Sequence, residues 1–236
     1  MLEKVALIIP AAGEGLRFNS GNGVRKPFVL LAGEPIIFHT LRRFADIDAI
    51  VQRVLVVHPT DLARVREEWG ARLKTAGISD LVAGGGTRRE SVARGLAALR
   101  DDIGIVAVHD SVRPFVSRRA IDESIREAAR CGGAVVASRM VATVKRADTE
   151  RRVVETVPRE NLWMAQTPQT FRKSLLADAY AAAVNDGIAA TDDSLLVERI
   201  GGTVVIVEES AANIKITTPD DLRLAEAIAR DVARQP

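Results

Sequence analysis

The sequence alternates short runs of apolar, β-branched residues with longer segments that are apolar on one face. Six such runs predict strands: "KVALIIP", "RVLVVHP", "DLVAGG", "GIVAVHD", "GAVVASR" and "TVVIVEE". Helices are predicted at 35–46, 61–73, 88–99, 117–130 and 172–184, and from Pro219, with Thr218 as the N-cap. Buried strands separated by helices predict an α/β fold, with a mainly parallel sheet and helices on both faces. In such a sheet the ligand lies beyond the carboxyl ends of the strands.

Residues 140–163, "MVATVKRADTERRVVETVPRENLW", interrupt this alternation. β-Branched and charged residues alternate there around a polar centre at 147–151, which predicts a β-hairpin with neither face apolar enough for the main core. An exposed two-stranded hairpin is only marginally stable alone. We therefore expect a single domain, 1–236, with a protruding arm at about 140–162 that packs on a second copy in a homodimer. A surface hairpin without a partner is the alternative.

The charge balance argues against a general polyanion-binding role. Charged residues make up 27% of the chain, but the formal net charge is only +2. This gives no global attraction to nucleic acid or to a membrane surface, so neither is an expected partner. The sequence shows no signal-peptide pattern and no apolar run as long as a membrane span, which predicts a cytoplasmic protein. The lone Cys131 cannot form an internal disulfide, and its apolar surroundings favour a buried thiol over a nucleophile.

The first candidate site follows the first predicted strand, in "ALIIPAAGEGLRF" at 6–18. A dinucleotide-binding G-x-G-x-x-G does not fit because Phe18 stands where the third glycine belongs. A P-loop does not fit because Pro27, and not Ser or Thr, follows Lys26. The small residues instead allow a ligand to approach backbone N–H groups, which can form an anion-binding nest, and Arg17 and Lys26 flank a polar stretch that could close over a polyphosphate. The alternative is a strand-to-helix turn with solvated basic residues.

Two further clusters follow later strands. The glycines of "AGGGTRRESV" end one strand and lead into a helix, where backbone N–H groups and the hydroxyl of Ser91 would face a ligand. Asp110 in "VAVHDSVRPF" ends an apolar strand, the usual position for an acid that holds a divalent cation against phosphates, and Arg113 adds positive charge. A glycine-rich turn and a turn or cap aspartate are the alternative interpretations. We assign no role to His109.

These residue types favour phosphoryl or nucleotidyl transfer. The chain has no G-x-S-x-G nucleophile elbow, no convincing Cys–His pair and no set of His and Cys residues at zinc-binding spacing. It offers cations, glycine turns and a carboxylate at a strand end, which is what the transfer of a phosphorus group requires.

Seven motifs occur together and in order: "PAAGEGLRF", "RKPFVLLAG", "GGGTRRESV", "VHDSVRPF", "LWMAQTPQTF", "TDDSLLVERIGG" and "NIKITTPDDL". In this combination the chain resembles the 2-C-methyl-D-erythritol 4-phosphate cytidylyltransferase family of the non-mevalonate isoprenoid pathway. The resemblance implies a Rossmann-like nucleotidyltransferase fold with a protruding β-hairpin dimerisation arm. It also implies an enzyme that transfers CMP from CTP to 2-C-methyl-D-erythritol 4-phosphate and releases pyrophosphate, with Mg²⁺ or another divalent cation held by Asp110.

The resemblance also assigns roles by position. The catalytic residues would be four cations, two that stabilise charge on the α-phosphorus and two that orient the sugar phosphate: Arg17 and Lys26, then Arg159 and Lys215. The CTP site would be lined by Ala11, Ala12, Gly13, Gly85, Ser91, Asp110, Ser111 and Arg113. Further contacts to the acceptor would come from Thr143, Thr167 and Thr191. Arg159, at the base of the arm, would act in the site of the partner subunit.

Two positions depart from the family pattern. These departures affect the prediction of the acceptor more than the prediction of the nucleotide. Many members carry an acid immediately before "NIK", where this chain has Ala212, and an Asp before the threonine of the arm, where it has Ala142. One alternative is therefore a cytidylyltransferase for another polyol phosphate, such as ribitol 5-phosphate. The other is a catalytically silent nucleotide-binding module, although binding alone would not need cations on both sides of the reacting phosphorus.

Overall fold

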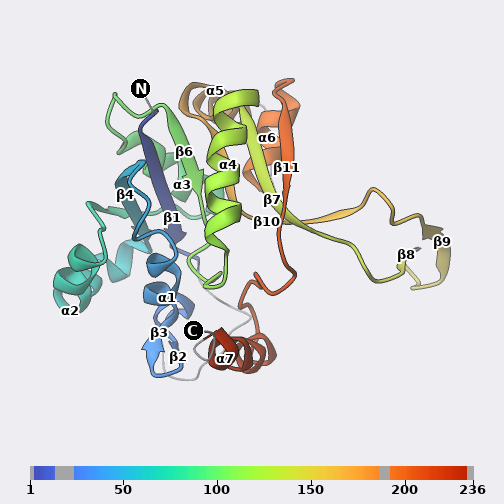
Figure 1. Ribbon diagram of the computed structural model, residues 1–236, viewed down its shortest axis with the longest axis horizontal. Helices are drawn as coiled ribbons and strands as arrows, with labels where there is room; N and C mark the ends of the chain where they lie inside the picture. Colours follow the sequence, from blue (N-terminus) through green and yellow to red (C-terminus); the bar gives the residue numbers. More distant parts are fainter. Residues whose placement is uncertain (1–2, 14–23, 186–191, 233–236) are drawn as a thin grey trace.

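A seven-stranded, mainly parallel sheet forms the centre of the computed structural model, which describes residues 3–13, 24–185 and 192–232 (Figure 1). The strand order is β11-β7-β10-β6-β1-β4-β5. All of these strands are parallel except β10, which runs antiparallel to both of its neighbours, β6 and β7. The bounds are β1 Val5–Ala11, β4 Ile50–Val57, β5 Asp80–Ala83, β6 Ile105–Val108, β7 Gly133–Arg139, β10 Trp163–Arg172 and β11 Val204–Glu208. The predicted mainly parallel sheet is confirmed.

Helices cover both faces of the sheet, as predicted. Alternate residues of β1 point to opposite faces: Leu7 packs in the cluster under α1 (Ile36–Arg42), α2 (Leu62–Thr75) and α4 (Arg118–Cys131). Ile8 packs on the other face, in the cluster that includes residues of α3 (Arg88–Ala97), α5 (Lys173–Asn185) and α6 (Asp193–Arg199). Because both faces are covered, the open rim of the sheet at its strand ends is left for a ligand.

Two elements of the sheet region were not predicted, and one was predicted too long. The strand β10 and the helix α6 are absent from the sequence-based prediction, and α1 ends at Arg42 in the structure, where the prediction runs to residue 46. Residues that follow α1 form turns, and single-turn 3₁₀ helices occur at Lys26–Phe28 and Pro59–Asp61.

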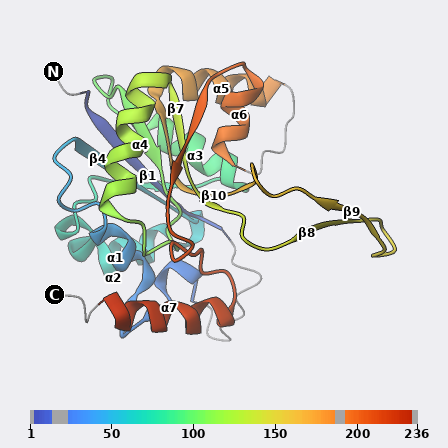
Figure 2. The same cartoon turned by 45° about the vertical axis from the view of Figure 1, so that its right-hand side comes forward.

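The last helix, α7 (Pro219–Val232), packs beside the two-residue strands β2 (Leu30–Leu31) and β3 (Glu34–Pro35) in a third apolar cluster (Figure 2). Its predicted start is confirmed, because the backbone N–H of Asp221 donates to Oγ1 of Thr218 at 3.2 Å. The Asp221 carboxylate accepts in return from the backbone N–H groups of Thr217 and Thr218, both at 2.8 Å. This reciprocal capping fixes the segment that enters the helix.

A hairpin of β8 (Val144–Ala147) and β9 (Val153–Val157) lies well away from the sheet (Figures 1 and 2). The chain leaves β7 in an extended segment, turns at the hairpin and returns along a second segment into β10. Val141, Val153 and Val154 are strongly exposed on this arm. The predicted hairpin is confirmed, while its packing on a second copy stays a prediction.

Within the described residues, no helix combines the length and the apolarity needed to cross a bilayer.

Candidate active site

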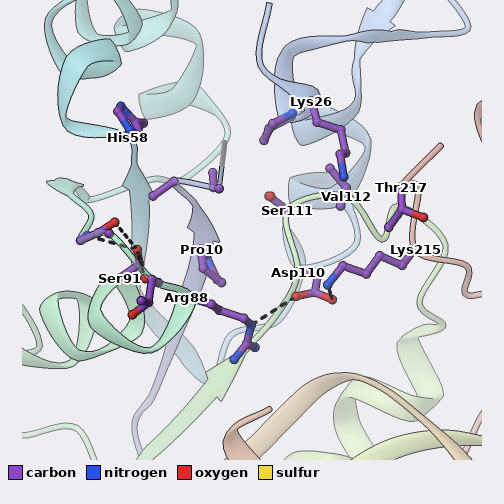
Figure 3. Close-up of a pocket in the computed structure, with 17 residues that line it drawn as sticks. Pro10, Lys26, His58, Arg88, Ser91, Asp110, Ser111, Val112, Lys215 and Thr217 are labelled. Atoms are coloured by element: carbon purple, nitrogen blue, oxygen red, sulfur yellow. Dashed lines mark hydrogen bonds and ion pairs between the residues drawn. The ribbon is translucent and has the colours of Figure 1, made fainter. Parts of the chain in front are cut away.

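A cavity of about 480 Å³ opens at the carboxyl ends of β1, β5 and β6, where the parallel topology brings three turns together (Figure 3). Most of the residues predicted for the nucleotide and for catalysis line it: Ala11, Ala12, Gly13, Lys26, Gly85, Ser91, Asp110, Ser111 and Lys215. They come from separate segments of the chain, so their convergence is a property of the fold. The cavity is also lined by residues that the prediction did not select, among them His58, Gly86, Thr87, Arg88 and Thr217.

Asp110 is the electrostatic centre of this cavity. Its carboxylate is buried, and Oδ2 lies 3.0 Å from Nζ of Lys215 and 3.2 Å from Nε of Arg113. Oδ1 lies 3.8 Å from Nε of Arg88, so that Asp110 stands between Arg88 and Lys215 (Figure 3). Burial alone would raise the pKa of this carboxyl, but the three cations hold it well below its usual range. The group is therefore ionised near neutral pH.

The glycines that follow β5 let its turn pack closely against the turn that follows β1. A Cβ atom on Gly84 would lie 2.4 Å from Cβ of Ala12 and 2.8 Å from Oγ of Ser91. The Ser91 hydroxyl accepts a hydrogen bond from the backbone N–H of Gly85 at 3.2 Å and donates one to the carbonyl of Thr87 at 2.9 Å. Ser91 therefore closes the turn, and only glycine at position 84 allows the two turns to meet.

We expect Gly84→Ala to push these turns apart and to destabilise the protein by about 1–3 kcal/mol, the usual cost of overpacking. Nucleotide affinity should fall as well, because both turns line the cavity. The measurements are the urea midpoint and the affinity for a nucleoside triphosphate. Gly86→Ala is the matched control for the urea midpoint, since its Cβ would come no closer than 3.7 Å to Glu90. Equal urea midpoints for the two variants would contradict the explanation that glycine is needed at position 84 for the two turns to pack closely.

Lys215 reaches Asp110 from the segment that precedes α7, and several hydrogen bonds hold that segment. The buried Asn213 side chain donates to Oε1 of Gln166 at 2.9 Å, and Nη1 of Arg113 donates to the Asn213 carbonyl at 2.7 Å. Arg113 thus connects Asp110 to the segment that carries Lys215. It is not among the described residues that line the cavity, and its predicted contact to CTP stays a prediction.

Thr167 lies behind the strand end that carries Asp110. Its buried hydroxyl accepts from the backbone N–H of Asp110 at 3.0 Å and lies 3.1 Å from Nδ1 of His109. Nε2 of His109 lies 3.0 Å from the carbonyl of Arg113. Complete burial lowers the pKa of His109 to about 4, so the ring is neutral near pH 7. Both side chains support the end of β6, and the predicted contact of Thr167 to the acceptor stays a prediction.

The remaining predicted residues lie elsewhere. Thr143 and Arg159 are exposed on the arm, where the Arg159 guanidinium donates to the carbonyl of Val141. Neither is among the described residues that line the cavity of the same chain. Arg17 and Thr191 lie outside the described residues.

Comparisons with known proteins agree with this geometry. A family model described as IspD, 2-C-methyl-D-erythritol 4-phosphate cytidylyltransferase, matches residues 5–231. The chain belongs to this cytidylyltransferase family. A relative of that name from Solibacter usitatus is 44% identical over 238 residues, which cover 98% of this chain and 97% of the relative. The relative from Syntrophus aciditrophicus is 40% identical over 98% of this chain and 97% of its own.

Two solved structures of cytidylyltransferase-family proteins have the same fold as this chain. The 2-C-methyl-D-erythritol 4-phosphate cytidylyltransferase from Thermus thermophilus superposes with a TM-score of 0.77 at 36% identity, covering 96% of this chain and 99% of that one. The 4-diphosphocytidyl-2C-methyl-D-erythritol synthase from Anaerococcus prevotii gives a TM-score of 0.84 at 29% identity, covering 97% and 96%. The expected Rossmann-like nucleotidyltransferase fold and the resemblance to this family of nucleotidyltransferase enzymes are confirmed.

The cavity of this cytidylyltransferase-family chain offers few protein ligands to a metal ion. It therefore suits a divalent cation that binds together with a polyphosphate better than a cation held by protein side chains alone. Among the described side chains, no group of three or more His, Cys, Asp or Glu could hold a metal. Asp110 is the only carboxylate on the described cavity wall. Its Oδ2 is shared by two cations, whereas the nearest cation to Oδ1 is beyond hydrogen-bond distance. One carboxylate oxygen plus substrate phosphates is a common binding mode for Mg²⁺.

Arg88 is the main cavity residue that the sequence-based prediction missed. It occupies the first position of α3, directly after the N-cap Thr87, where the helix dipole disfavours a cation. An arginine in such a position needs a nearby anion, and its place after a glycine turn indicates the ligand side of the sheet. These two features could have identified it in the cytidylyltransferase motif "GGGTRRESV".

Proposed function

We propose that this chain transfers CMP from CTP to 2-C-methyl-D-erythritol 4-phosphate, giving 4-diphosphocytidyl-2-C-methyl-D-erythritol and pyrophosphate for isoprenoid precursor biosynthesis. The observation that carries this proposal is the convergence of two glycine turns, Lys26, Lys215 and Asp110 on one cavity. Membership in the cytidylyltransferase family supports the choice of nucleotide and acceptor. We also propose that residues 1–236 form one catalytic domain, since the first strand, β1, and the last, β11, belong to the same seven-stranded sheet. The domain would act as a cytoplasmic homodimer.

CTP would lie across the carboxyl ends of the strands. The turn containing Gly85 and Ser91 would hold the cytosine, and the small residues Ala11, Ala12 and Gly13 would let the phosphates approach the backbone. Lys26 would neutralise the triphosphate together with Arg17. When magnesium is bound, it supplies further charge neutralisation to the phosphates and to the leaving pyrophosphate.

The acceptor phosphate is already ionised, so its attack on the α-phosphorus needs no general base. The obstacle is repulsion between two anions, which grows as water leaves the site and the local dielectric falls. Lys26 and Lys215, which both line the cavity, would offset that repulsion. Lys215 would also orient the acceptor phosphate, together with Arg159 of a second subunit.

The arm suggests that each active site uses two chains. Arg159 is exposed at its base and is not among the described residues lining the cavity of its own chain, which supports a role in a neighbouring subunit.

Co-expression of Arg159→Ala and Lys26→Ala chains should therefore restore activity. A mixed dimer would contain one site with both residues intact, so random pairing should recover about one quarter of the wild-type activity. The measurement is pyrophosphate release by the co-expressed pair, with each variant alone as the control. If activity stays at the level of the separate variants, each site uses its own Arg159.

The function is tested by pyrophosphate release from CTP, ATP, GTP and UTP, each offered with a panel of polyol phosphates. We expect turnover with CTP and 2-C-methyl-D-erythritol 4-phosphate. Faster turnover with ribitol 5-phosphate would reassign the acceptor and would connect the departures at Ala142 and Ala212 to specificity. Absence of pyrophosphate release with every pair would contradict an enzymatic role.

A further inference from the structure

Arg88 is held on the cavity wall by a buried network that connects three helices. Its Nη1 and Nη2 donate to Oδ1 and Oδ2 of Asp193, at 2.9 and 2.7 Å. Asp193 is 1% exposed, and the buried Tyr180 hydroxyl donates to its Oδ1. Arg88 begins α3, Asp193 begins α6 and Tyr180 lies in α5. The guanidinium is thus fixed in its plane by a bidentate partner that is itself fixed.

The network is also anchored to the sheet. The side-chain oxygen of Gln169, in β10, accepts from the backbone N–H groups of Asp193 at 2.9 Å and Ser194 at 3.0 Å. The Gln169 amide donates to Asp192 at 2.9 Å. The carboxylate that holds Arg88 is therefore placed by a central strand of the sheet, which also pairs with β6, the strand that precedes Asp110.

Stability alone does not explain this arrangement. Replacing a buried ion pair by apolar residues of similar size is often neutral or stabilising, because burying two charges is costly. Burial would lower the pKa of Arg88, but Asp193 raises it above its usual value, so the arginine remains charged. Its side chain keeps 29% exposure and lines the cavity between Ser91 and Asp110 (Figure 3). A guanidinium has five N–H donors, and the two hydrogen bonds to Asp193 leave others for a ligand.

We propose that Arg88 is a nucleotide-contacting residue, and that Asp193 and Tyr180 are positioning residues that hold its guanidinium in the orientation that binds CTP. This proposal rests on the proposed function, because it takes CTP as the occupant of the cavity. Asp193 already neutralises the charge of Arg88, so Arg88 would bind the nucleotide through N–H donors held in a fixed orientation. Lys26 would instead act through its positive charge. Disturbing the network should weaken nucleotide binding and leave the affinity for the acceptor largely unchanged.

The test measures CTP binding by calorimetry, and KM for each substrate, for Arg88→Lys, Asp193→Asn and Tyr180→Phe. We expect Kd and KM for CTP to rise by about 10- to 100-fold in Asp193→Asn, the usual effect of losing a charged hydrogen bond, and less in Tyr180→Phe. KM for the acceptor should change little. Arg89→Lys is the matched control, because Arg89 follows on the same helix, donates to the carbonyl of Ala183 and is not among the described residues lining the cavity.

A double variant separates positioning from stability. Arg88→Met with Asp193→Leu removes both charges, so the unfolding temperature should recover toward that of the wild type while CTP binding stays weak. If Asp193→Asn fails to fold, Tyr180→Phe carries the test of positioning and the double variant carries the test of the Arg88 contact. Wild-type affinity for CTP in Asp193→Asn would overturn the positioning role, and wild-type affinity in the double variant would overturn the contact by Arg88. Either result leaves the proposed function standing. Failure of the wild type to bind or consume CTP would instead overturn the proposed function.

Discussion

Lys26→Ala is expected to lower kcat/KM for CTP by about 10²–10³-fold, the effect of removing one well-placed group that stabilises transition-state charge. Lys26 lines the cavity together with the turn that follows β1 and with Lys215. Charge on the phosphorus oxygens increases in the transition state, so loss of the ammonium group should affect turnover more than ground-state binding. Steady-state kinetics with CTP varied at saturating acceptor measures the effect.

Two controls accompany this variant. Lys4→Ala removes an exposed lysine that pairs with Asp102 at 2.7 Å, far from the cavity in the fold, and should leave turnover unchanged. Far-UV circular dichroism and the unfolding temperature of Lys26→Ala should match the wild type. Unchanged turnover in a folded Lys26→Ala protein would remove this residue from the mechanism.

Chelation of divalent cations is expected to reduce turnover below detection, and added magnesium should restore it. Asp110 is permanently ionised, and its Oδ1 is less closely approached by cations than its Oδ2. It can therefore serve as the protein ligand of an ion whose other ligands are phosphate oxygens and water. The measurement is pyrophosphate release in the presence of a chelator, followed by titration with magnesium. Sodium chloride at matched ionic strength is the control for charge screening.

Asp110→Asn should weaken the response to magnesium, so a higher concentration is needed for half-maximal activity. The expected cause is the loss of an anionic ligand in a site that keeps its neighbouring cations. Activity that persists in the chelator, or an unaltered magnesium response in a folded Asp110→Asn protein, would contradict the metal-binding role of this carboxylate.

Much of the sheet was predictable because its central parallel strands, such as β1 and β6, are buried on both faces. A strand of this kind appears in the sequence as a short apolar run, and each of the six predicted runs corresponds to a strand. The strand β10 lacks that pattern: "WMAQTPQTFR" contains a proline and several polar residues, and its register shifts between Ala165 and Gln169. Buried Gln169 is tolerated there because it holds the start of α6. That partner is 24 residues away and is not visible in a local pattern.

The candidate site was predictable where each residue follows a strand. Gly13, Gly85 and Asp110 fall at carboxyl ends of strands, so a parallel topology is enough to bring them to one rim. The roles of Arg88 and Arg113 depend on partners far away in the sequence. Arg88 pairs with Asp193 and Arg113 with the Asn213 carbonyl, contacts that span 105 and 100 residues. Such pairs follow from the packing of distant helices and loops, which a single sequence does not reveal.

The way in which the arm joins the body has a mechanical consequence. Its two segments continue β7 and β10, which are neighbours inside the sheet and not at an edge (Figure 1). A pull along the arm therefore loads β7 and β10 together in shear, against the hydrogen bonds that join β7 to β11 and β10 to β6. A projection mounted on an edge strand would load the hydrogen bonds to one neighbouring strand alone. Tension on the hairpin is thus spread over many bonds at once, some of them to β6, the strand that precedes Asp110.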